Sequence, residues 1–203
     1  MSRQKTFDQQ KVLVGARNLF WEKGYEKTSL SDLLEVMQIH KKSFYDTFGS
    51  KKELFIKALQ NYHDEVIAMM TAEVSREATG LGKIRRVFEV SLEFDGGMQR
   101  GCMLVNTISD NYEGSAEIRD LIMKWTEEIK TNFAAFLKED KRSGLLSPSA
   151  DIEAEASRLS NAFTGFRLQL KMCKSRSELV ELINCILAVY PLSAGIHISV
   201  NAE

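Results

Sequence analysis

The feature that most restricts the fold of this chain is a helical pattern of apolar residues that continues through nearly all of its 203 positions. The segment LSDLLEVM at residues 30–37, for example, places apolar side chains three and four positions apart, and therefore on one face of a helix. Prolines interrupt the pattern only at Pro148 and Pro191. The alternation typical of a strand is confined to residues 196–200. We therefore predict an all-α fold.

Residue pairs that commonly begin helices divide this pattern into segments. In a capping box, a Ser or Thr and an acidic or amide side chain three positions later each satisfy a free backbone N–H group of the other. Such pairs predict helix starts, and Gly24 and Gly144 predict helix ends. The pairs are Thr6 with Gln9, Ser29 with Asp32, Ser50 with Glu53, and Ser175 with Glu178.

Charge is unevenly distributed, although the formal net charge is only −1. Residues 1–60 contain 11 Lys and Arg against 7 Asp and Glu, whereas the remaining residues contain 16 against 21. A basic amino-terminal segment on an acidic remainder indicates a segment that binds a polyanion, although a modest excess of this kind is also common on solvated surfaces.

Cysteine and targeting patterns exclude several classes of protein. Cys102, Cys173 and Cys185 do not form a CxxC pair, and no cluster of Cys and His has the spacing of a zinc site. The amino-terminal residues lack the apolar core of a signal peptide, and the most apolar tract is short and contains Pro191. We therefore expect a reduced, cytoplasmic protein with no membrane span, metal or cofactor.

The stretch QIHKKSFYDTFGSKKELF, residues 38–55, predicts a short helix that follows a tight turn. At 100° per residue, Phe44 and Phe48 fall together on the inner face. Lysine, tyrosine and hydroxyl side chains fall on the outer face and its flanks, as a helix in the major groove of DNA requires. The same lysines would also solvate a three-helix bundle without DNA.

The longer segment ARNLFWEKGYEKTSLSDLLEVMQIHKKSFYDTFGSKKELF, residues 16–55, resembles the TetR family of bacterial transcriptional regulators. The resemblance rests on a combination of positions that is more specific than any single motif. These positions are Ala16, Phe20, Gly24, Tyr25, Thr28, Leu33, Tyr45 and Lys51. It implies a three-helix DNA-binding head, residues 1–50, on a ligand-binding and dimerisation body, residues 51–203. The connecting helix is expected to start near residue 50.

The resemblance also assigns DNA contacts residue by residue. It makes Thr28 and Lys51 phosphate contacts, and it places Thr47 at the far end of the recognition helix, where a further phosphate contact is usual. The side chains that it places on the recognition helix itself are Lys41, Lys42, Ser43 and Tyr45.

Ser29 and His40 complete the predicted interface, and Gln38 and Asp46 lie beside it. Ser29, beside Thr28, offers free N–H groups to a phosphate at the start of the second helix. His40 is either a phosphate donor or an ordinary surface histidine, and it stands where the family commonly has a capping Ser or Thr. Gln38 stands where the family usually has glycine in the turn. Asp46 either accepts from a cytosine amino group or pairs with Lys42.

Apolar stripes in the last two predicted helices resemble the segments with which the family forms a four-helix dimer interface. A two-fold dimer would place two recognition helices about one turn of DNA apart, so that the operator would be palindromic. The same stripes could instead be intramolecular core. The expected interface residues are Phe163, Phe166, Leu170, Leu179, Leu182, Ile183 and Ile186.

The middle of the chain is where a small-molecule effector would bind. The large side chains expected to line the pocket are Phe88, Met103, Trp125 and Phe133, although an apolar residue at helical spacing is more often core. Cys102, in the segment RGCMLVNTISD, lies at a predicted helix start beside Arg100. Such a thiol is either a sensor of oxidants and electrophiles or a small buried residue.

We therefore expect a dimeric DNA-binding regulator, most simply a repressor that a small molecule releases from its operator. A redox-responsive regulator that acts through Cys102 is one alternative. A helical partner-binding module without a DNA role is another, and it predicts that the outer face of the short helix is dispensable. An enzyme is not expected, because His40, His63 and His197 are all assigned to segments away from Cys102.

Overall fold

The computed structural model describes residues 7–93, 100–110, 115–172 and 175–190. Within these ranges the chain forms nine helices and no β-strand, which confirms the all-α prediction. Residues 196–200, where strand alternation was noted, lie outside the described part. The helices are α1 (Gln9–Lys23), α2 (Leu30–Met37), α3 (Lys41–Phe48), α4 (Lys51–Val74), α5 (Gly80–Glu93), α7 (Met103–Ser109), α8 (Ala116–Arg142), α9 (Ile152–Gln169) and α10 (Arg176–Leu187).

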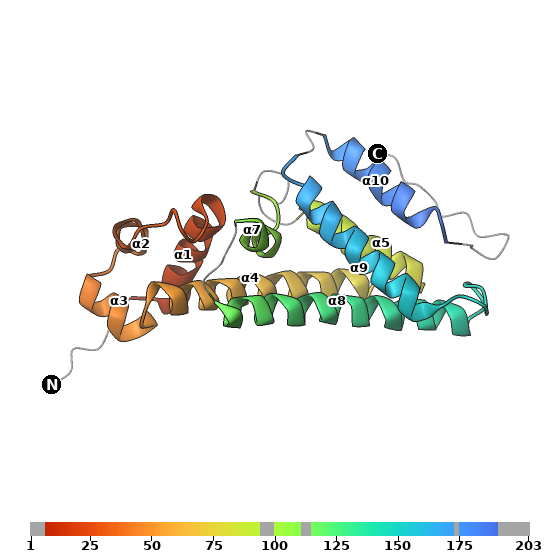
Figure 1. Ribbon diagram of the computed structural model, residues 1–203, viewed down its shortest axis with the longest axis horizontal. Coiled ribbons are helices and arrows are strands. Elements are labelled where there is room, and N and C mark those ends of the chain that lie inside the picture. The colour runs from red at the N-terminus through yellow and green to blue at the C-terminus, as the bar shows by residue number, and fades with distance from the viewer. Residues whose placement is uncertain (1–6, 94–99, 111–114, 173–174, 191–203) are drawn as a thin grey trace.

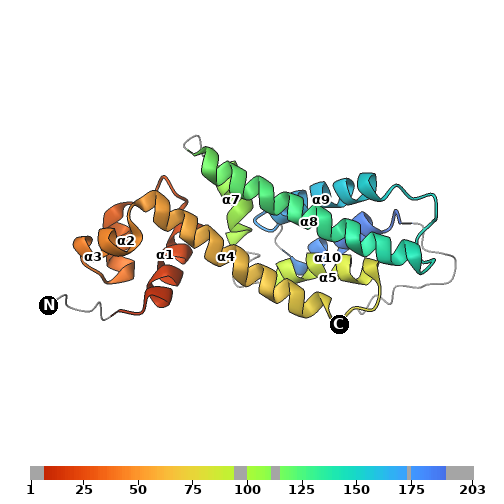
Figure 2. The same cartoon turned by 90° about the horizontal axis from the view of Figure 1, so that it is seen from below.

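The helices form an elongated molecule with the head at one end (Figure 1). Helices α1 to α3 make up the head, and α4 runs from it into the body in both views (Figures 1 and 2). The body contains α5 and α7 to α10, with α9 and α10 on the side away from α4 in Figure 1. No helix among the described residues has both the length and the apolar character needed to cross a membrane.

The predicted helix starts agree with the structure at three of four positions. Ser29 and Asp32 form the complete reciprocal capping box of α2. The hydroxyls of Ser50 and Ser175 each accept a hydrogen bond from the backbone N–H three positions later, at the starts of α4 and α10. The first helix begins instead after Asp8, whose carboxylate accepts from two backbone N–H groups, while Thr6 lies outside the described residues.

Two hydrophobic cores hold the molecule together. The first joins α1, α2 and α3 to the amino-terminal half of α4 and continues into α7 and the start of α8. The second packs α5 against α8, α9 and α10. Because the first core passes from the head into the body, the expected domain boundary at residue 50 does not coincide with a gap in packing and stays a prediction.

The start of α5 is capped by a residue of another helix. Asp140 of α8 is buried, and its two carboxylate oxygens accept from the backbone N–H groups of Gly80 and Leu81, each at 2.7 Å. The first turn of α5 contains no acidic residue of its own, so Asp140 supplies the negative charge that a helix start favours. A Cβ on Gly80 would lie 2.0 Å from the carbonyl oxygen of Phe136, which explains the glycine.

Replacement of Asp140 by alanine is expected to lower the free energy of unfolding by about 3 kcal/mol, because two charge-assisted bonds to buried N–H groups are lost. Asp140→Asn, which keeps one acceptor oxygen, should lose less. Urea denaturation followed by far-ultraviolet circular dichroism measures both values. A loss under about 1 kcal/mol for the alanine variant would show that water replaces the carboxylate.

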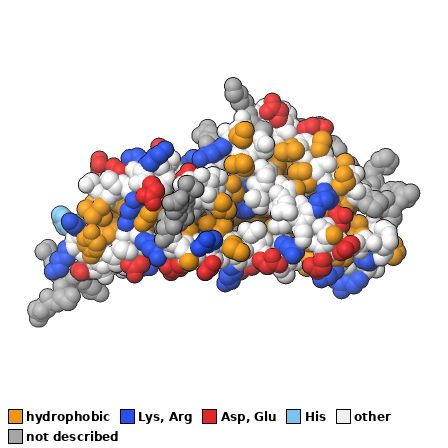
Figure 3. Space-filling model, viewed as in Figure 1, with side chains coloured by type: hydrophobic (Ala, Val, Ile, Leu, Met, Phe, Trp, Pro, Cys, Tyr) orange, Lys and Arg blue, Asp and Glu red, His pale blue; other side chains and the backbone are white. Residues whose placement is uncertain are grey.

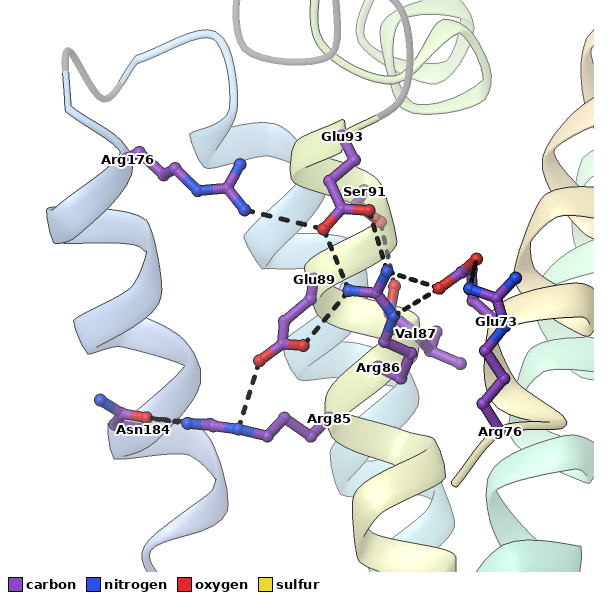
Figure 4. Close-up of polar contacts among 10 residues, drawn as sticks. All are labelled: Glu73, Arg76, Arg85, Arg86, Val87, Glu89, Ser91, Glu93, Arg176 and Asn184. Atoms are coloured by element: carbon purple, nitrogen blue, oxygen red, sulfur yellow. Dashed lines mark hydrogen bonds and ion pairs between the residues drawn. The ribbon is translucent and has the colours of Figure 1, made fainter. Parts of the chain in front are cut away.

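An ionic network attaches α10 and the end of α4 to α5 (Figure 4). The Arg86 guanidinium contacts the carboxylates of Glu73, Glu89 and Glu93, and Arg176 of α10 approaches Glu93 at 3.7 Å. The hydrogen bond from Arg86 lowers the pKa of Glu73, and the bond to Glu93 raises the pKa of Arg86. These contacts hold one side of α10 against the body.

Candidate nucleic-acid interface

The turn between α2 and α3 is closed by a residue in the left-handed conformation. Gln38 has φ 52° and ψ 39°, and its backbone N–H donates to the carbonyl of Glu35. Glycine adopts this conformation without strain, whereas a residue with a Cβ is held in it at a cost of about 1 kcal/mol. The turn therefore keeps the geometry expected of the family pattern although Gln38 replaces glycine.

The short helix α3 is fixed to the head by its two phenylalanines. Phe44 and Phe48 are both buried, and their ring centroids lie 6.1 Å apart. They belong to the same core as Phe20 and Leu33, as the sequence predicts. His40 precedes the helix without a side-chain cap, so packing rather than capping holds α3 in place.

The opposite face of α3 is open to solvent. His40, Lys41, Lys42 and Asp46 are exposed, and 47% of the Tyr45 surface is accessible. No ion pair joins Lys42 to Asp46 among the described residues, so the intrahelical alternative for Asp46 is not supported. The half-buried hydroxyls beside this face belong to Ser43 and Thr47.

Residues that flank α3 differ in what they offer to DNA. Lys51 is half-buried, and its Nζ lies 4.3 Å from the centre of the Tyr25 ring, so its amine is held beside the start of α4. Ser29 is exposed at the start of α2. These positions and the exposed face of α3 agree with a surface that meets a duplex.

The assignment of Thr28 as a phosphate contact is corrected by the structure. Its side chain has no accessible surface, and its hydroxyl donates to the carbonyl oxygen of Gly24 at 2.6 Å. A buried hydroxyl that already donates to the backbone cannot reach a phosphate. Thr28 therefore joins the end of α1 to the start of α2, and the free N–H groups at that start come from Ser29 and its successors.

The sequence matches two family models over most of its length. The model described as "Bacterial regulatory proteins, tetR family" matches residues 12–58, which include all of α2 and α3. The model described as "Tetracyclin repressor-like, C-terminal domain" matches residues 80–186, more than half of the chain. The chain belongs to the TetR family. It is accordingly a transcriptional regulator with a helix-turn-helix head.

Individual proteins support the same conclusion. The uncharacterized HTH-type transcriptional regulator YezE of Bacillus subtilis (strain 168) is 28% identical over 93% of this chain and 99% of its own length. The HTH-type transcriptional repressor ComR of Escherichia coli (strain K12) is 24% identical over 93% of this chain and 91% of its own length. A cysteine mutant of the TetR family regulator CifR was solved with 26-bp double-strand operator DNA. It is 26% identical with a TM-score of 0.79, over 93% of this chain and 100% of the CifR chain.

In this TetR-family chain, most of the residues expected at the dimer interface are intramolecular core. Five of the seven are buried within the single chain, where those of α9 and its end pack against α5 and α8, and those of α10 pack against α5 and α9. The helical spacing of apolar residues in α9 and α10 correctly predicted a buried face, but that face is turned towards the chain's own helices. The five buried residues are Phe163, Phe166, Leu170, Leu179 and Ile183, while Leu182 and Ile186 are half-buried.

The pocket predictions also need correction. Phe88 and Phe133 are fully buried, and their rings stack 6.2 Å apart in the core of the body. Met103 lines a small hollow between α1 and α7. Trp125 lines a larger pocket with residues of α4, α7, α8 and α9, and this central pocket is partly open to solvent. The central pocket is lined by Tyr62, His63, Val66, Ile67, Met70, Leu104, Ile108, Ile122, Trp125, Thr126, Ile129, Phe163, Thr164 and Arg167.

Cys102 lies at the junction of the central pocket and the head. It is the residue before α7, it is 3% exposed, and Nη1 of Arg167 lies 3.5 Å from its Sγ. Burial, with the neighbouring Cys102 thiol as a further cause, raises the pKa of Tyr62 well above its ordinary value. Arg100, which the sequence places beside the thiol, lies instead over the ring of Trp21.

Trp21 connects the head directly to this junction, a role that the sequence did not reveal. Its Nε1 donates to the carbonyl oxygen of Gly101 at 3.0 Å, in a buried hydrogen bond between α1 and the segment before α7. A tryptophan next to the apolar stripe of α1 was the available signal, because a buried indole N–H needs an acceptor. The head and the segment that contains Gly101 and Cys102 are therefore in direct contact.

Trp21→Phe is expected to lower the free energy of unfolding by about 1 to 2 kcal/mol, since the Gly101 carbonyl would be left buried without its donor. Trp125→Phe is the matched control, because the Trp125 ring stacks on His63 with centroids 4.1 Å apart and its indole N–H makes no hydrogen bond within the described residues. Urea denaturation monitored by circular dichroism compares the two. Equal losses would show that ring volume, not the hydrogen bond, matters at position 21.

Proposed function

We propose that this regulator represses transcription by binding a palindromic operator as a homodimer, and that a small molecule in the central pocket releases it. The observation that carries the proposal is the geometry of α3, whose phenylalanines are buried in the head while its lysines and Tyr45 face solvent. That arrangement suits a helix that enters the major groove. The repressor ComR and the operator complex of CifR support it by analogy.

A second copy of the chain is expected on the outer face of α9 and α10. This dimer face consists of Gly165, Leu168, Met172, Cys185 and Val189, all of them exposed. Hydrophobic side chains are visible over α9 and α10 in the space-filling view (Figure 3). Residues 165, 168 and 172 are spaced by three and four, so they share one side of α9 and its end. A two-fold axis through this face would pair α9 and α10 with their symmetry mates.

Effector release needs contact between the pocket and the head, and the structure provides a short route. Arg167 lines the central pocket and touches Cys102, and the adjacent Gly101 accepts the hydrogen bond of Trp21 in α1. A ligand that favours a different position of this segment would change the orientation of the head. Operator affinity then falls by the ratio of the ligand's affinities for the two arrangements.

Selection from a random DNA library, followed by fluorescence anisotropy on the selected sequence, tests the proposal. We expect an inverted repeat, one dimer per site, and an affinity that falls steeply with salt because lysine–phosphate contacts release counterions. Equal binding to selected and unrelated DNA would contradict recognition by α3. In that case a partner-binding role without DNA becomes the better explanation of the exposed face.

A thiol-based response through Cys102 is the second candidate, and the position of its Sγ, 3.5 Å from Nη1 of Arg167 and next to the Trp21 contact at Gly101, favours it. Burial of the thiol limits access for oxidants. The anisotropy titration repeated with hydrogen peroxide, for the unsubstituted chain and for Cys102→Ser, distinguishes the candidates. Peroxide-induced release that the serine variant loses would support the thiol mechanism.

A further inference from the structure

We propose that the effector of the central pocket is a small apolar carboxylate whose anionic group pairs with Arg167. This inference rests on the proposed function, because it names the class of ligand that the same pocket takes. It is carried by a guanidinium that has no acidic partner in a pocket with apolar walls.

The walls of the central pocket favour an apolar ligand body. Aliphatic side chains from α4, α7 and α8 line it, and Phe163 and Trp125 add aromatic surface. The hydroxyls of Thr126 and Thr164 donate to carbonyl oxygens of their own helices, so their protons are already used. A ligand with a ring or a branched chain would therefore contact mostly carbon, which supplies affinity through the hydrophobic effect.

Arg167 is the one Lys or Arg among the residues that line this pocket. Its guanidinium carbon lies 4.7 Å from the centre of the Phe163 ring. Its recorded hydrogen bond goes to the weak acceptor Sγ of Cys102, and its buried Nε has no hydrogen-bond partner. No ion pair of Arg167 is found among the described residues. Arg167 as a whole is half-buried, and a cation drawn partly out of water normally has an acidic partner.

A carboxylate is the ligand group that best matches this cation. The planar guanidinium offers paired N–H donors whose spacing fits two carboxylate oxygens, and such bonds are stronger than neutral ones. Other charged groups do not compete inside the pocket. Asp and Glu are absent from its described lining, and burial lowers the pKa of His63, which therefore favours the neutral form at pH 7.

The position of Arg167 also explains how the binding of such a ligand would affect the head. A carboxylate that takes up its N–H donors competes with the contact between Arg167 and Cys102. Cys102 follows Gly101, whose carbonyl receives the Trp21 hydrogen bond. Gly101 itself has φ +68°, a conformation that few residues other than glycine adopt without strain.

The test uses three aromatic acids, namely benzoate, phenylacetate and 3-phenylpropionate, each paired with its uncharged amide. Isothermal titration calorimetry measures binding to the full chain. The fluorescence of a Trp21→Phe chain, in which Trp125 of the pocket wall is the one remaining tryptophan, reports whether the site is the central pocket. We expect at least one acid to bind with a Kd at or below about 1 mM and its amide to bind at least about tenfold more weakly.

Two substitutions on α9 make the test specific. Arg167→Gln should weaken the bound acid by at least about tenfold, the effect of losing a charge-assisted pair. Arg158→Gln is the matched control, because Arg158 lies on the same helix over the Tyr190 ring and does not line the central pocket. The control should bind the acid as the unsubstituted chain does. Should Arg167→Gln not fold, the comparison of acid with amide decides alone.

Several outcomes would overturn the proposal. They are failure of all three acids to bind, equal binding of acid and amide, and acid binding that Arg167→Gln leaves unchanged. Operator affinity without ligand, measured on the same samples, separates this failure from that of the proposed function. Sequence-specific DNA binding without acid binding would leave the repressor intact and reject only the ligand class.

Discussion

Replacing Lys42 and Tyr45 together by alanine is expected to lower operator affinity by about 100-fold or more, with the fold retained. Both side chains lie on the exposed face of α3, and neither contributes to the core that Phe44 and Phe48 form. A dimer presents each of them twice, so four contacts are lost from one operator. At about 0.7 kcal/mol or more per contact, the total reaches the stated effect.

The salt dependence of binding identifies which contact each residue makes. Removal of Lys42 alone should reduce the slope of log K against log salt by about one for each half-site, as loss of a phosphate contact does. Loss of Tyr45 should leave the slope unchanged and reduce discrimination between selected and altered operators. Lys11→Ala, an exposed lysine of α1 in the same head, is the control. If the double variant at Lys42 and Tyr45 bound the operator within threefold of the unsubstituted chain, α3 would be shown not to enter the groove.

The head could be predicted from the sequence because its signals are local. The capping box of α2, the glycine that ends α1 and the buried pair on α3 each act within a few residues. Even Gln38, at the usual place of glycine, adopts the left-handed conformation of the turn, because the packing of α2 and α3 fixes the backbone around it. Thr28 is the exception, because its hydroxyl reaches backward to Gly24 rather than outward.

The body could not be predicted in the same way, because an apolar stripe shows that a helix face is buried but not what covers it. Phe163 of α9 and Leu179 of α10 are covered by other helices of the same chain, and Phe88 and Phe133 stack within that core. Only the three-dimensional arrangement shows which face remains uncovered.

Arg167, Trp21 and Asp140 acquire their roles from residues at least 59 positions away in the chain, as the partners Cys102, Gly101, Gly80 and Leu81 show. No short motif marks such pairs. A single charged residue or tryptophan beside an apolar stripe is the available signal, and it does not identify the partner.

Gly165→Glu is expected to dissociate the dimer while leaving each chain folded. Gly165 is exposed in the middle of α9, and nothing lies within 4 Å of the position that its Cβ would take. Glycine there costs α9 about 1 kcal/mol relative to a good helix former, so the isolated chain should tolerate or favour glutamate. The absence of a side chain is explained if a neighbouring helix of a second copy approaches closely at this point.

In such a dimer, two glutamates would face each other across the two-fold axis, and their charge and bulk would oppose the contact. We expect the dissociation constant of the dimer to rise at least about 100-fold, and operator affinity to fall at least as much, because the second head is no longer held near its half-site. Sedimentation velocity measures the first effect and anisotropy the second, with circular dichroism to confirm helicity. Ala135→Glu, the same change at an exposed small residue of α8, should alter neither. A Gly165→Glu chain that remains dimeric and binds operator normally would place the interface on another surface, and the uncovered face of α9 and α10 would then need a different occupant.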